Sequence, residues 1–149
     1  MTEAWLATFY ATLVLSIGYA LVRGSGPERL GAGVLIAMTV MQFTARAVIP
    51  PDFTTVYLVS LIVDAFGVVA FGTLAIYAKR VWPLWATSLQ VLSLTAHFAQ
   101  EVGDTSNIGT YIVMKGAPTF LAILVLLAGA IAHRRRLRHH GTDPAWKAW

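Results

Sequence analysis

The chain has 149 residues, of which 57% are hydrophobic and 12% are charged, and its formal net charge is +4. Soluble domains carry about 25% charged residues, so this composition indicates a polytopic membrane protein folded as one small bundle. The absence of cysteine excludes disulfides, thiolate catalysis and sulfur-ligated metals. The basic balance does not indicate nucleic-acid binding, because the charges lie mostly between apolar segments and near the C-terminus, where membrane topology explains them.

The chain begins MTEAWLATF, with an acidic residue, Glu3, where a cleavable signal peptide carries Lys or Arg. We therefore expect a retained first membrane span. Further apolar segments follow, separated by polar turns such as RGSGPER and GDTSN, and each approaches the roughly 20 residues that a helix needs to cross a bilayer. The alternating polarity of barrel strands is missing. The sequence predicts an all-α bundle of five transmembrane helices at about 5–22, 30–48, 56–77, 82–102 and 108–132, followed by a basic tail at 133–149.

The basic residues predict the orientation of this bundle. With five spans, the turns at 23–29 and 79–80 and the tail fall on one side, and only Arg46 and Lys115 lie on the other. The positive-inside rule then places the N-terminus outside and the C-terminus in the cytoplasm. We expect Trp82 and Trp85 in the inner aromatic belt. The closing WKAW is expected to be a frayed terminus; the alternative is a segment resting on the inner leaflet.

Polar residues gather in the outer half of the expected bundle, whereas the inner half is expected to be almost purely apolar. Asp64 lies within the third span, where a charge is costly, and His97 and Glu101 share one face of the fourth helix. The predicted polar pocket comprises Gln42, Arg46, Asp64, His97, Gln100, Glu101 and Lys115.

Two interpretations of this pocket remain open. In the structural one, Arg46 neutralises Asp64, Lys115 neutralises Glu101, and the pairs fix helix register. In the functional one, the pocket opens outward and holds a lipid headgroup, a quinone or a small anion, while His97 and Asp64 pass protons. Pro118 is expected to kink the fifth helix near Lys115.

Metal and haem sites are disfavoured. The spacing from His97 to Glu101 is H-x-x-x-E rather than H-E-x-x-H, and the other histidines lie in or beside the basic tail. No cofactor is therefore predicted beyond a bound lipid or quinone.

The first span carries small residues at intervals of four, which predicts a helix-packing ridge. The ridge residues are Thr8, Thr12, Ser16 and Ala20. Their expected partner is another span of this chain, another subunit or a second copy of this chain.

The second half of the chain resembles small multi-pass inner-membrane proteins of alphaproteobacteria. The resemblance covers roughly residues 60–136 and is carried by VDAFGVVAFG (63–72), the basic turn before WPLW, LQVLSLTAHFA (89–99) and the last apolar span into RRR. It implies a bacterial inner-membrane location and assigns no catalytic residue. The expected function is a non-catalytic accessory or scaffold subunit of a larger membrane complex; the alternative is a small transporter or ligand-binding protein.

Overall fold

The computed structural model describes residues 2–48, 53–102 and 108–148, and the side chains of residues 3–48, 58–97 and 116–148. These residues form an all-helical fold, as the sequence predicts. The helices are α1 (Thr2–Arg23), α2 (Gly26–Val48), α3 (Phe53–Tyr77), α4 (Trp82–Val102) and α5 (Ile108–His140). Two bounds differ clearly from expectation: α2 begins earlier, at Gly26, and α5 continues through the basic segment to His140.

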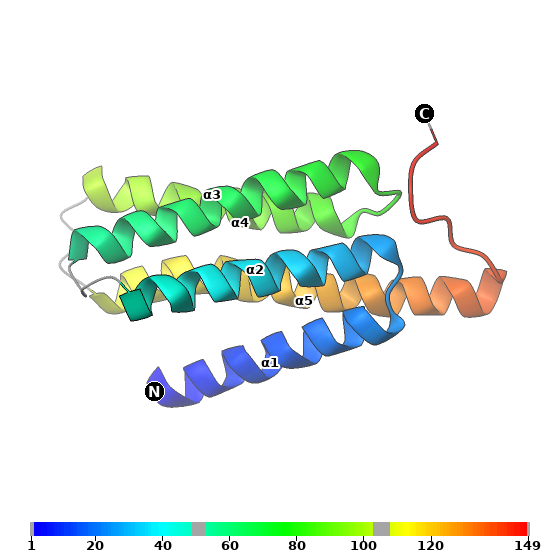
Figure 1. The fold of residues 1–149 in the computed structure, drawn as a ribbon, viewed down its shortest axis with the longest axis horizontal. Helices are drawn as coiled ribbons and strands as arrows, with labels where there is room; N and C mark the ends of the chain where they lie inside the picture. The colour runs from blue at the N-terminus through cyan, green and yellow to red at the C-terminus, as the bar shows by residue number, and fades with distance from the viewer. Residues whose placement is uncertain (1, 49–52, 103–107, 149) are drawn as a thin grey trace.

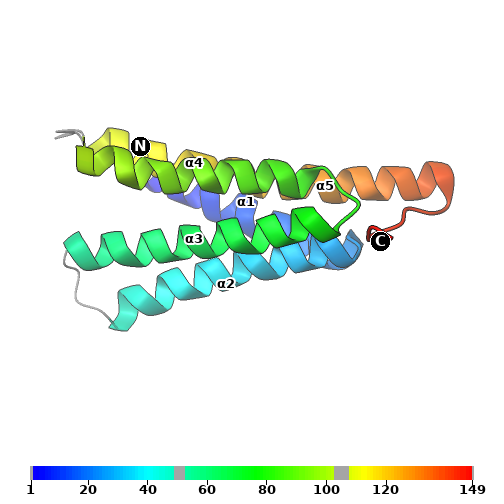
Figure 2. The same cartoon turned by 90° about the horizontal axis from the view of Figure 1, so that it is seen from above.

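The helices run up and down along one long axis (Figure 1). Each packs against its neighbour in sequence, α5 closes the ring against α1, and α2 also contacts α5 across the bundle. Figure 2 shows α4 and α5 lying together along one side, with α2 and α3 along the other. We call one end the tail end: it holds the α1–α2 and α3–α4 turns, the last turns of α5 and the C-terminal segment.

The α1–α2 turn follows from two local signals. A side chain on Gly24 would place its Cβ 2.3 Å from the carbonyl oxygen of Ala20, so this tight turn requires glycine. Ser25 then caps α2, because its amide donates to the Glu28 carboxylate at 3.0 Å and its carbonyl accepts from the Arg29 amide at 3.0 Å. Ser25 and Glu28 form the S-x-x-E capping box.

Small residues allow the helices to approach closely in the core. Ala20, Ala32, Ala86, Ala122 and Ala130 are fully buried, one or two from each of α1, α2, α4 and α5. This is the packing typical of membrane helices, where van der Waals contact replaces a hydrophobic driving force.

The ridge predicted on α1 divides into two parts. Ser16 and Ala20 are fully buried inside the bundle, so their partner is this chain itself. Thr8 is exposed and Thr12 is half-buried, and each hydroxyl donates to the carbonyl oxygen one turn earlier on α1.

Four stretches of the described residues are long and apolar enough to cross a membrane. They are Glu3–Arg23, Gly26–Val48, Leu58–Tyr77 and Gly116–His140, which belong to α1, α2, α3 and α5. Helix α4 packs between α3 and α5. The chain is thus an apolar helical bundle suited to a membrane, and a fifth crossing by α4 stays a prediction.

Candidate functional site

A first polar cluster lies inside the bundle between α3 and α4; we call it the mid-bundle cluster. The Ser93 hydroxyl donates to Oδ2 of Asp64 at 2.9 Å, and Nε2 of His97 lies 2.9 Å from the same oxygen. Ser93 and His97 are one helical turn apart, so both face α3. All three side chains are buried. A buried carboxylate in contact with an imidazole is a site where a proton can be held or transferred.

Polar groups continue from this cluster along the bundle. Gln90 is fully buried one turn from Ser93, and both its amide atoms lack a hydrogen-bond partner within the described part of the chain. Gly67 makes room for it, since a Cβ there would lie 3.2 Å from the Gln90 amide carbon. Nearby on α2 and α3, Gln42 donates to Ser60 at 3.5 Å.

The structure brings together only part of the polar pocket predicted from the sequence. Asp64 and His97 meet as expected. The pairing of Arg46 with Asp64, which belonged to the structural interpretation, does not form: Arg46 is exposed, and Asp64 faces α4, where His97 and Ser93 contact it. The predicted Gln100, Glu101 and Lys115 lie outside the described side chains.

A second cluster lies at the tail end, centred on Arg80 in the α3–α4 turn. Nε of Arg80 donates to Oε1 of Glu28 at 3.1 Å, and the side chains are 3% and 0% exposed. The indole of Trp82 donates to the same oxygen at 3.2 Å, and the Ser25 hydroxyl donates to the other carboxylate oxygen. The buried Glu28 carboxylate on α2 therefore binds the α3–α4 turn and the start of α4 through one oxygen and Ser25 through the other.

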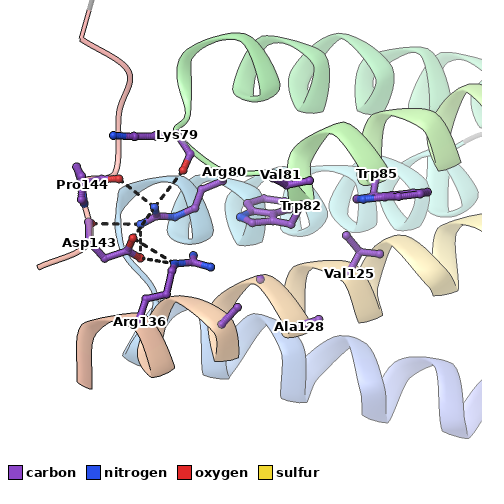
Figure 3. Close-up of a pocket in the computed structure, with 12 residues that line it drawn as sticks. Lys79, Arg80, Val81, Trp82, Trp85, Val125, Ala128, Arg136, Asp143 and Pro144 are labelled. Atoms are coloured by element: carbon purple, nitrogen blue, oxygen red, sulfur yellow. Dashed lines mark hydrogen bonds and ion pairs between the residues drawn. The ribbon is translucent and has the colours of Figure 1, made fainter. Parts of the chain in front are cut away.

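The C-terminal segment supplies the rest of this cluster through Asp143. Its Oδ1 accepts a hydrogen bond from one terminal nitrogen of Arg80 at 3.1 Å, and its Oδ2 lies 2.9 Å from the other terminal nitrogen in an ion pair (Figure 3). Nδ1 of His133 lies 2.7 Å from Asp143, and Nε of Arg136 donates to it at 3.2 Å. Arg80 also donates to the Pro144 carbonyl at 2.9 Å. We call Glu28, Arg80, His133, Arg136 and Asp143 the tail-end cluster.

The protonation of Asp143 reflects these neighbours. Burial alone would raise the pKa of this carboxyl. The hydrogen bond from His133, the charges of Arg80 and Arg136 and the hydrogen bond from Arg136 outweigh burial and hold its pKa below the usual 3.8. Asp143 is thus a carboxylate at neutral pH.

Residues 141–148, which we call the C-terminal strap, fold back across the tail end. Gly141 ends α5 with a φ of 70°, and its amide donates to the Leu137 carbonyl at 3.0 Å, as in a glycine C-cap. The strap then pairs with the end of α3: Lys79 donates to the Ala145 carbonyl at 2.9 Å, and Lys147 to the Tyr77 carbonyl at 3.0 Å. The expectation of a frayed terminus is therefore wrong for these residues.

Trp82 is part of the core, not of the aromatic belt. Its indole is 6% exposed and packs edge-on to Phe71. Glycines flank it: a Cβ on Gly31 of α2 would lie 2.4 Å from the ring, and one on Gly129 of α5 would lie 2.5 Å from it. The belt position predicted for Trp82 is wrong because these glycines open space for the ring between the helices. Trp85, at 61% exposure, does face outward.

A hollow of about 700 Å³ adjoins the tail-end cluster between the start of α4 and the second half of α5. One end is basic, lined by Lys79 and Arg136 beside the strap, and the other is apolar, lined by Trp85, Val125 and Ala128 (Figure 3). The volume is within the roughly 300–1,000 Å³ of small-molecule sites.

The expectation of an almost purely apolar inner half is wrong, because the end that we took as inner buries Glu28 and Arg80. One local signal was available: S-x-x-E at 25–28 predicts a cap. Nothing local indicates that Asp143 contacts Arg80, because the two are 63 residues apart. In the described part of the chain, no three His, Asp or Glu side chains form a metal site.

No family model matches this chain, and no curated protein or solved structure matches it either.

Proposed function

We propose that this protein is a non-catalytic integral membrane subunit, an accessory or scaffold protein of a larger complex in a bacterial inner membrane. In this proposal all five helices cross the bilayer, the N-terminus is outside and the C-terminal strap is cytoplasmic. The charge pattern supports the orientation, because the basic residues of the α1–α2 turn, the α3–α4 turn and the end of α5 lie together at the tail end. The bacterial location rests on the sequence resemblance.

One observation carries the proposal: the buried ionisable side chains of the described residues bind one another and join helices. Asp64 with His97 joins α3 to α4, and Glu28 with Arg80 joins α2 to the α3–α4 turn. Asp143 joins that turn to α5 through His133. Buried contacts of this kind fix the register and orientation of the helices relative to one another, as a scaffold requires.

The test is extraction in mild detergent through an affinity tag, followed by native mass spectrometry. A fixed ratio with other membrane proteins is expected, and the same ratio is expected from Asp64→Asn, which keeps the shape of the side chain. A monodisperse single chain with full thermal stability, recovered from native membranes with no partner, would contradict the accessory role.

Gln90 favours a second candidate, a small transporter or ligand-binding protein. Its amide is fully buried without a hydrogen-bond partner in the described residues, next to the mid-bundle cluster. Burying an unpaired amide costs about 1–3 kcal/mol in proteins, so a polar ligand or transported ion passing this point would recover that energy.

Reconstitution into vesicles separates the two candidates. A transporter should lose proton-linked flux in Asp64→Asn and His97→Ala while inserting normally. Thr95→Ala is the matched control, because Thr95 is exposed on α4 between Ser93 and His97 and its hydroxyl donates to the Val91 carbonyl of its own helix. Absence of flux in the unmodified protein, in any ion gradient tried, would favour the scaffold.

A further inference from the structure

The hollow between α4 and α5 has a chemical polarity that neither candidate function uses. Three cationic side chains and one carboxylate line its basic end: Lys79, Arg80, Arg136 and Asp143. The opposite end has only apolar side chains, with Trp85 and Val125 facing each other from α4 and α5 (Figure 3). The hollow is thus amphipathic along its length.

The basic end retains donors that the tail-end cluster does not use. Arg80 is saturated, since all three of its nitrogens donate to Glu28, Asp143 and neighbouring groups. Arg136 uses only its Nε, toward Asp143, and its side chain is 43% exposed. Within the described residues its two terminal nitrogens have no hydrogen-bond acceptor, whereas the Lys79 side chain points past the strap, away from Arg136 (Figure 3).

The apolar end is open toward the surroundings of the bundle. Trp85 is 61% exposed, and Ala128 on α5 is exposed beside it, so the small side chain leaves a trough against the indole. Exposed tryptophan near the end of membrane helices is typical of the interface between acyl chains and headgroups. The basic end then lies at headgroup depth, and the trough faces acyl chains.

These features point to one occupant. A soluble anion would use only the basic end, and an uncharged lipid only the trough. We propose that the hollow binds an anionic phospholipid, with Arg136 donating to its phosphate and the first part of an acyl chain lying against Trp85, Val125 and Ala128. Arginine suits this role because its planar terminal nitrogens bind phosphate in a two-pronged geometry. Asp143 does not repel the phosphate strongly, since Arg80 neutralises it.

The test compares retention of phosphatidylglycerol and phosphatidylcholine by the detergent-purified full chain in native mass spectrometry. The variant is Arg136→Gln. The matched control is Arg135→Gln, which removes the same charge from an exposed residue that does not line the hollow. We expect one phosphatidylglycerol retained per chain, and at least about tenfold weaker retention in the first variant only, as for loss of a charge-assisted hydrogen bond.

A second variant tests the trough. Ala128→Leu adds a side chain at an exposed position and should weaken retention of phosphatidylglycerol, while glycerol 3-phosphate, which has no acyl chain, should bind poorly to all forms. Melting temperature and helix content show that each variant is folded.

Three outcomes would overturn the proposal. These are equal retention of phosphatidylcholine, equal loss in the Arg135→Gln control, which would mean general surface attraction, or tight binding of glycerol 3-phosphate alone. None depends on whether the chain is a subunit of a complex.

Discussion

Arg80 is the residue on which most contacts of the tail end converge. It binds Glu28 of α2 and Asp143 of the strap while its own position is set by the α3–α4 turn. Removing one partner of a buried ion pair leaves the other charge uncompensated, and this costs about 3–5 kcal/mol. The contribution of this arginine is therefore best measured by its removal.

We expect Arg80→Gln to lower the free energy of unfolding in detergent by about 3–5 kcal/mol, because Glu28 stays buried without its cation and Asp143 loses one of its two arginines. Thermal or denaturant unfolding followed by circular dichroism measures the change. Arg135→Gln is the control, since Arg135 is exposed and should change stability by less than about 0.5 kcal/mol. Equal stability of the two variants would show that the ion pairs contribute little.

Two glycines of α2, one against Trp82 and one away from it, predict different effects of adding a methyl group. Gly31→Ala should lower the free energy of unfolding by about 1–3 kcal/mol, because its Cβ would lie 2.4 Å from the buried indole. Gly33→Ala, two residues away on α2, meets no atom within 4 Å and should be neutral or stabilising. The comparison uses melting temperatures of the two variants, and a similar loss in both would contradict the packing of Trp82 described here.

At the scale of elements, the C-terminal strap joins the end of α5 to α2 and to the α3–α4 turn. Trp146 packs against Gly26, where a Cβ would lie 3.0 Å from the indole, and the Lys147 ammonium donates to the Ala75 carbonyl at 3.2 Å. Asp143 supplies the charged contacts of the strap through its ion pairs with Arg80 and Arg136. Strap attachment should therefore depend on the charge of Asp143.

We expect the strap to detach in acid. The folded-state pKa of Asp143 is below 3.8, so the stabilisation is complete above about pH 5 and is lost as pH falls through the folded-state pKa. The chain has no cysteine, so a spin label on Ala148→Cys reports strap mobility without background. The label should be immobile at neutral pH and become mobile as the pH falls through the folded-state pKa of Asp143, with helix content retained.

Asp143→Asn is the matched variant for this experiment. It removes the charge with little change in shape, so its label should be mobile already at neutral pH and insensitive to acid. A label that stays immobile in acid in both forms would show that the backbone pairing to Tyr77 and Lys79 holds the strap without the ion pairs.

At the scale of the whole molecule, charge is distributed very unevenly between the two ends of the bundle. At the tail end α5 extends beyond the other helices (Figure 1), and this last part of α5 carries the arginines at 134–136. Arg46 lies at the opposite end, in the last turn of α2. Basic residues resist translocation, so the tail end should face the cytoplasm.

Single cysteines test this orientation. In right-side-out membrane vesicles, an impermeant maleimide should label Glu3→Cys directly and Thr142→Cys only after permeabilisation, since both positions are exposed. The opposite pattern would reverse the assigned topology, and labelling of both in sealed vesicles would mean an even number of crossings.

Hydropathy and turn residues in the sequence determined the number of helices, their approximate bounds and the membrane character of the fold. These properties are local: an apolar run forms a helix whatever it packs against. The sequence also predicted that Asp64 and His97 approach each other, because both are polar residues in apolar spans joined by a short turn. It could not distinguish Arg46 from His97 as the contact of Asp64, since that depends on which face of α3 meets α4.

Only the tertiary structure decided the role of the tail end. Glu28 and Arg80 are 52 residues apart, and their contact exists because α2 begins where α3 ends, on the same side of the bundle. Burial of Trp82 likewise requires glycines from α2 and α5 to meet it at one level. Hydropathy reports how a residue interacts with its solvent, whereas partner choice depends on helix rotation and register, which packing of all five helices sets together.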